Sequence, residues 1–158
     1  MFDLFLEEIL TSSDRYKIYF LRYQAAELEK KIQFLNASKI NVINLGKELS
    51  LYIDSLDDFS YLTIDVYDFV IKLLDNSKAE FKDNSNSVLA IYNFGIFWEA
   101  SLELNVTSIL KEFSKSSSLI ILWENNLEIA HRLTWPTQST SIFLDFSDIQ
   151  LKELKYEI

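Results

Sequence analysis

The stretch VLAIYNFGIFWEASLELNVTSILKEFSKSSSLIILWEN, residues 88–125, decides the fold. It opens with an almost wholly apolar run at 88–94 and ends with a second apolar run at 119–123. Between the two runs, Asn105 precedes a segment whose apolar residues recur at helical spacing. The stretch therefore predicts a strand, a helix capped by Asn105 and another strand. Strands that are apolar at nearly every position are typical of parallel sheets covered on both faces.

The rest of the chain repeats this alternation of strands and helices, with no internal repeat and no long linker. Such alternation predicts a single α/β domain over residues 1–158, with a mostly parallel central sheet flanked by helices. We expect the strands at 16–21, 88–94 and 119–123 at its buried centre. Two further strands are expected at 40–45 and 141–146, and helices are expected at 2–12, 25–35, 47–56 and 62–74. Thr63 is the expected cap of the last of these helices. A polar loop is expected at 75–87.

The composition excludes most catalytic signatures. The chain has only two glycines, Gly46 and Gly95, which are too far apart for either a G-x-x-x-x-G-K-[ST] or a G-x-G-x-x-G phosphate loop. It has no cysteine and one histidine, which excludes cysteine nucleophiles, iron–sulfur clusters and motifs with two histidines. We therefore predict that the protein is not an enzyme and has no catalytic residue, cofactor or metal.

The charge of the chain argues against nucleic acid and membranes as partners. It has 15 basic and 24 acidic residues, a net charge of −9, and no basic patch for phosphate contacts. The N-terminal segment is acidic and lacks the basic start of a signal peptide. The longest apolar run, 119–123, is far shorter than the roughly 18 residues that suggest a membrane span. We expect a cytoplasmic protein.

Several short motifs carry a family resemblance. The second expected strand leads into INLGKELS at 43–50, LKEFS stands at 110–114 before the strand that ends WEN at 123–125, and LTW stands at 133–135. In their order along the chain and in their residues, these motifs resemble those of the BrxF-type small P-loop proteins of bacteriophage-exclusion (BREX) defence systems. The resemblance spans nearly the whole chain and implies a P-loop-NTPase-like sheet.

The nucleotide-binding positions of that family are degenerate here. After the first strand the chain reads RYQAAELE at 22–29, without the glycines, lysine and hydroxyl that hold phosphate and magnesium. Two glutamates stand there instead. Tyr92 replaces the aspartate that supports magnesium and Gly95 replaces the family glutamate, whereas Asn93 fits the pattern. The resemblance implies an ATPase-like fold, and the residues argue against ATPase chemistry.

The leading hypothesis is a non-catalytic, pseudo-ATPase accessory or adaptor subunit of a bacterial anti-phage defence complex. It would act by docking onto larger protein components, and it could also form homo-oligomers. Trp123 ends an apolar strand and is expected in the core, whereas the sequence leaves Trp98 and Trp135 open between core and interface. The candidate partner-binding residues are an acidic face of Asp54, Asp57 and Asp58 and an aromatic edge of Phe97, Trp98 and Trp135.

Two alternatives from other classes stay open. The acidic charge fits a DNA mimic or an inhibitor that blocks a DNA-binding protein. A metal-dependent enzyme would instead use the carboxylates between 54 and 68. Neighbouring genes separate the first two hypotheses, because a defence subunit would be encoded beside other defence genes. A metal-binding measurement tests the third.

Overall fold

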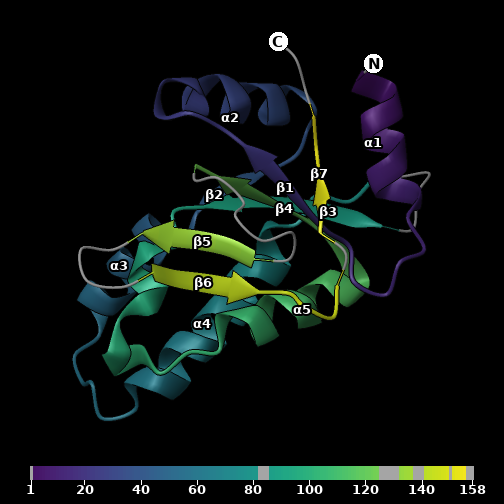
Figure 1. Cartoon of the computed structure of the whole chain (residues 1–158). Helices are drawn as coiled ribbons and strands as arrows, with labels where there is room; N and C mark the ends of the chain where they lie inside the picture. Colours follow the sequence, from purple (N-terminus) through teal and green to yellow (C-terminus); the bar gives the residue numbers. More distant parts are fainter. Residues whose placement is uncertain (1, 82–85, 125–131, 137–140, 150, 156–158) are drawn as a thin grey trace.

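The computed structural model describes residues 2–81, 86–124, 132–136, 141–149 and 151–155. Helices and strands are interleaved along the chain up to residue 123, with two consecutive helices at 45–55 and 62–77, and the fold is α/β (Figure 1). The helices are α1 (Phe2–Thr11), α2 (Leu28–Ala37), α3 (Leu45–Ser55), α4 (Leu62–Ser77) and α5 (Val106–Ser116), with 3₁₀ turns η1 (Ala25–Glu27), η2 (Gly95–Trp98) and η3 (Ala100–Leu102). The strands are β1 (Ile18–Arg22), β2 (Val42–Asn44), β3 (Ser87–Tyr92), β4 (Ser117–Trp123), β5 (Arg132–Pro136), β6 (Ser141–Asp145) and β7 (Lys152–Glu153).

Five strands form one parallel sheet in the order β2-β3-β4-β1-β7. β4 lies in the middle and pairs with β1 and β3, so that Leu119 lies between Ile18 and Leu89. The three strands predicted for the buried centre, β1, β3 and β4, do occupy it. The prediction of a mostly parallel central sheet flanked by helices is confirmed.

Helices cover both faces of this sheet because its strands are apolar on both faces. Neighbouring residues of β1 point to opposite sides: Phe20 packs with α3, α4 and α5, and Leu21 packs with α1 and α2. Figure 1 shows α1 and α2 on one side and α3, α4, α5 and the β5–β6 pair on the other. The longest helix, α4, has 16 residues, and no helix in the described ranges is long and apolar enough to cross a membrane.

The predicted strand at 141–146 exists, as β6, but it does not join the central sheet. It pairs antiparallel with β5, a strand that the sequence analysis did not predict. Leu133 and Leu144, which face each other in this pair, are buried against the core on the α5 side. The position of the fifth strand in the sheet is taken by β7, which has only two residues.

The predicted cap and the predicted end of α4 both differ from the structure, and the predicted cap of α5 is confirmed. Thr63 is not the cap of α4, because the helix already begins at Leu62, after Tyr61. At its other end α4 continues to Ser77, and β3 begins at Ser87, so the expected polar loop at 75–87 is shorter; residues 82–85 lie outside the described residues. The Asn105 side chain caps α5 as predicted by accepting a hydrogen bond from the backbone N–H of Ser108 at 3.1 Å.

The carboxyl ends of β2 and β3 are joined by two asparagine side chains. Asn93 Nδ2 donates to Asn44 Oδ1 at 2.8 Å, and the same Asn44 oxygen accepts from the backbone N–H of Lys47 to cap α3. Asn93 has a φ of 66°, in the left-handed region. Gly46 lies against this pair: a Cβ atom at Gly46 would approach Asn93 Cγ to 2.7 Å.

We predict that Gly46→Ala destabilises the protein by about 1–3 kcal/mol, the usual cost of overpacking. Helix propensity alone predicts the opposite sign, because alanine is favoured over glycine inside a helix by roughly 0.5–1 kcal/mol. Urea unfolding followed by tryptophan fluorescence measures the difference in the free energy of unfolding. In an Asn93→Gly background the crowding side chain is removed and the positive φ is tolerated, so Gly46→Ala should cost clearly less there, although the backbone oxygen of residue 93 would still lie 3.1 Å from the new Cβ atom. An equal cost in both backgrounds would contradict this account.

Candidate protein-docking site

The three predicted acidic residues lie together on the side of the molecule formed by α3 and α4. Asp54 lies in the last turn of α3, and Asp57 and Asp58 lie in the loop between α3 and α4. All three side chains are exposed. The structure therefore leaves all three predicted acidic residues open to solvent within one short segment.

The same segment exposes large apolar side chains. Their exposed fractions reach 67% at Tyr61 and are 48% at the least exposed of them, Tyr67. Within the part of the chain whose side chains are described, every strongly exposed large hydrophobic residue lies between positions 51 and 67. We refer to these residues as the α3–α4 patch: Leu51, Phe59, Tyr61, Ile64 and Tyr67. Contiguous exposed apolar surface is typical of an interaction site, whereas scattered single residues are not informative. Here the exposed residues all belong to α3, α4 and the loop between them.

The amphipathic pattern of α4 explains why these residues face outward. Val66, Val70 and Leu74 recur every fourth residue and are buried against the sheet. Ile64 and Tyr67 lie off this stripe, so the packing that buries the stripe turns them toward solvent. Farther along the helix the Phe69 ring stacks on Tyr52 of α3, with centroids 4.1 Å apart and planes 1° from parallel. This stack holds α3 and α4 side by side.

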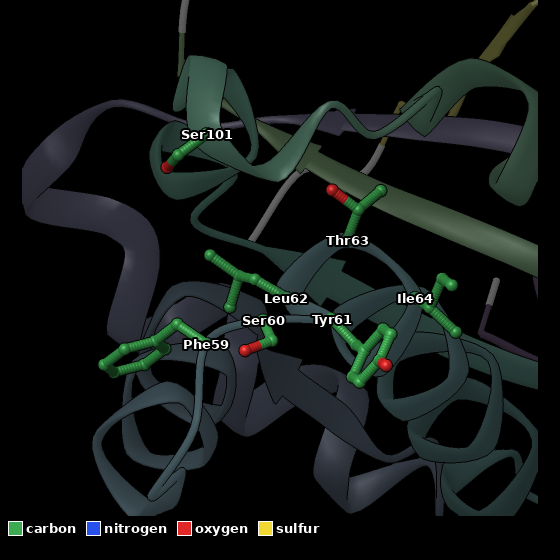
Figure 2. A pocket seen from close by; sticks show the side chains of 7 residues that line it. All are labelled: Phe59, Ser60, Tyr61, Leu62, Thr63, Ile64 and Ser101. Atoms are coloured by element: carbon green, nitrogen blue, oxygen red, sulfur yellow. The ribbon is translucent and has the colours of Figure 1, made fainter.

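A shallow hollow of about 380 Å³ adjoins the patch at the start of α4. Figure 2 shows Thr63 and Leu62 on the α4 side and Ser101 of η3 on a separate helical turn facing them. The lining is mixed, with apolar side chains and hydroxyl groups. The residues around it are Phe59, Ser60, Tyr61, Leu62, Thr63, Ile64 and Ser101.

The electrostatics of the segment are one-sided. Residues 49–71 contain five aspartates, at positions 54, 57, 58, 65 and 68, and no lysine, arginine or histidine. Asp58 also shapes the loop: its Oδ1 accepts from the Ser60 hydroxyl at 2.6 Å and from the Ser60 backbone N–H at 2.9 Å. These two hydrogen bonds, the hydroxyl first, lower the pKa of Asp58 below its ordinary value of 3.8. The α3–α4 patch thus combines exposed apolar side chains with negatively charged neighbours.

Of the three residues of the predicted aromatic edge, the structure buries one, Phe97. Phe97 is only 4% exposed, because η2 turns it into the core beside Phe94, so its prediction as a contact residue is wrong. Trp98 is half-buried against the core, and its indole Nε1 is buried with no hydrogen-bond partner in the described structure. Trp135 lies in β5, and its side chain lies outside the described residues. Trp123 is 1% exposed, which confirms its place in the core.

Residues 22–29 and Tyr92 stand where the resembled family binds phosphate and magnesium, and their side chains are unsuited to binding a phosphate. After β1 the Tyr23 side chain is buried, and burial is the main cause that raises its pKa, followed by the nearby Glu124 and Tyr92. Tyr92 packs against the same cluster. The backbone N–H of Glu27 is occupied, because it donates to Gln24 O at 2.7 Å. Glutamate carboxylates at 27 and 29 stand at the start of α2. Anions would meet negative charge there.

No carboxylate cluster suited to a metal ion is present among the described side chains: no three Asp, Glu or His side chains are placed so that they could hold one ion. The sequence analysis did not predict the apolar half of the candidate site. The sequence did carry a signal for it, because Ile64 and Tyr67 are apolar residues off the buried stripe of α4. The pattern did not indicate that they stay uncovered by every segment that the structure describes.

We predict that the carboxyl group of Asp58 titrates below the ordinary aspartate value and that Ser60→Ala raises its pKa. The substitution removes the hydroxyl bond, the larger cause of the shift, and leaves the backbone bond in place. Side-chain carboxyl chemical shifts followed over an NMR pH titration report the change. An Asp58 pKa that is the same in both proteins would show that the loop does not hold this hydrogen bond in solution.

Comparison with known proteins identifies no relative. No protein-family model matches the chain, and no curated protein and no solved structure is detectably similar to it. The likeness to BREX proteins therefore rests on the short motifs alone.

Proposed function

We propose that this protein is a non-catalytic adaptor that acts by docking onto another protein through the α3–α4 patch. The observation that carries the proposal is the gathering of the exposed apolar residues in one acidic segment. The wider setting we propose is a cytoplasmic anti-phage defence complex in which the chain is a pseudo-ATPase accessory subunit.

Exposed apolar area gives the patch a physical reason to bind. Tyr61 and Ile64 each expose more than half of their surface, and covering such side chains with a partner removes apolar area from water. Binding energy in protein interfaces comes mainly from a few such anchors, with tyrosine among the enriched types. Asp54, Asp57 and Asp58 around them would set the association rate and the choice of partner more than the affinity.

Two features support the pseudo-ATPase part of the proposal. Strands β1, β3 and β4 lie at the centre of the sheet, as expected if the chain keeps the order of a P-loop protein. At the carboxyl ends of these strands, where ligands of open α/β sheets usually bind, the buried Tyr23 and the half-buried Tyr92 take up space. A fold of this class without a phosphate cradle fits an adaptor that has lost its nucleotide chemistry.

The acidic segment gives specific support to one alternative function, an inhibitor that mimics DNA. Residues 49–71 contain five aspartates and no basic residue, which makes this segment locally anionic. An inhibitor of this kind would bind a protein whose nucleic-acid site is basic, and DNA would displace it. The apolar side chains among the aspartates favour the adaptor, because DNA offers its partners no comparable apolar anchors.

We predict that the protein neither binds nor hydrolyses ATP. The segment 22–29 offers no glycine or lysine and no serine or threonine hydroxyl for the phosphates and magnesium. Calorimetric titration with ATP and magnesium should give only the heat of dilution, and phosphate release should equal the buffer blank. Micromolar binding that substitutions within 22–29 abolish would overturn the pseudo-ATPase proposal.

We predict that the tagged protein, purified from its native host with the neighbouring genes intact, retains a protein partner at stoichiometric level. Native mass spectrometry gives the stoichiometry, and adding competing DNA separates the two functions. A partner retained in DNA supports the adaptor, and one displaced by DNA supports the mimic. A clean monomer recovered from an active system would contradict both.

A further inference from the structure

We infer that the partner element bound by the α3–α4 patch is a cationic amphipathic helix. The inference rests on the proposed adaptor function and specifies the chemistry of what docks. It follows from three properties of the patch: the backbone hydrogen bonds of its residues, the charge around them, and the spacing of its apolar side chains.

The patch recognises its partner by side chains rather than by strand pairing. Its residues lie on α3, on α4 and in the loop between them, where the helical backbone groups are already bonded within each helix. The edges of the central sheet are β2 and β7, and neither contributes a residue to the patch. Addition of an extended strand, which needs a free sheet edge, is therefore not available here.

The charge of the patch selects a cationic partner. Asp68 follows Ile64 by one helical turn on α4, and both side chains are exposed, so a carboxylate and an apolar side chain share one face. In the loop, the hydrogen bonds from Ser60 favour the ionised form of Asp58. A second copy of the same surface, an anionic lipid surface and a nucleic acid all bring negative charge and are disfavoured.

The apolar side chains suit a helix. Ile64 and Tyr67 are one helical turn apart, and the hollow beside Ile64, also flanked by Phe59, has room for an apolar anchor. Helices that dock on such surfaces present apolar anchors at i, i+3 or i+4 and i+7. Lysine or arginine side chains next to those anchors would meet the aspartates, and the rings of Tyr61 and Tyr67 can add cation–π contacts.

The test uses a synthetic peptide of leucine and lysine, about 18 residues long, with leucine at amphipathic helical spacing. Fluorescence anisotropy of the labelled peptide measures its dissociation constant with the full chain. Two control peptides have the same length: one has the same composition with the leucines spread evenly around the helix, and one has glutamate in place of lysine. We expect saturable binding of the first peptide alone, weakened by added salt.

Matched variants locate the binding surface. Tyr67→Ala should weaken binding of the amphipathic peptide at least tenfold, and Asn76→Ala, also exposed on α4 but on the side opposite Tyr67, should not. Asp57→Lys with Asp58→Lys should weaken it more than Glu7→Lys with Glu8→Lys, an exposed pair on α1 with the same change in net charge. Circular dichroism and thermal unfolding confirm that each variant is folded. Equal binding of the even-leucine peptide, or equal loss in the control variants, would overturn the inference.

The host purification separates this inference from the adaptor function on which it rests. If Tyr67→Ala and the Asp57/Asp58 reversal both lose the stoichiometric partner while their controls keep it, the patch is the docking site. If all variants keep the partner, the adaptor function stands and the inference about the patch fails. If no protein captures a partner, the adaptor function fails whatever the peptide does.

Discussion

The structure depends on the pairing of β4 with β1 on one side and β3 on the other. All seven residues of β4 are buried, so its backbone groups depend on those two strands for hydrogen bonds and its side chains depend on helices above and below. The β4 residues alternate between the two core clusters: Leu119 and Ile121 join the larger one, and Ile120 and Leu122 join the smaller. This requirement for cover on two faces places α1 and α2 opposite α3, α4 and α5.

The strands with continuous apolar runs were predictable from sequence, because a strand buried on both faces has apolar residues at nearly every position and is therefore easy to recognise. The β5–β6 pair was not, because a short strand with one buried face reads much like a strand of the central sheet. Leu144 and Phe146 are buried and Asp145 between them is not, which is the pattern of a half-covered antiparallel pair. Which sheet a strand joins depends on contacts that distant segments make, and single-segment periodicity does not report them.

The candidate site was predictable only in its charged half. The aspartates around position 57 are visible as a run in the sequence, and their exposure follows from their charge. Periodicity predicts which side of α4 faces the sheet, through Val66 and Val70, but not whether a further element covers the other side. Phe97 shows the converse error: a chain segment that follows a strand reads as an edge loop, and a 3₁₀ turn instead folds its ring inward.

The parallel pairing of β1 with β4 also has a consequence for how the chain folds. Ile18 pairs with Leu119, about a hundred positions farther along the chain. During synthesis β1 emerges long before β4, the strand that pairs with it, and until β4 is made the apolar side chains of β1 lack that neighbour. Contacts of such long range are closed late and slowly, because the entropy of the intervening loop is lost before the contact forms. The N-terminal half of this protein therefore depends on the C-terminal half for its stability. An incomplete chain would expose β1 as an unpaired strand edge, which promotes aggregation.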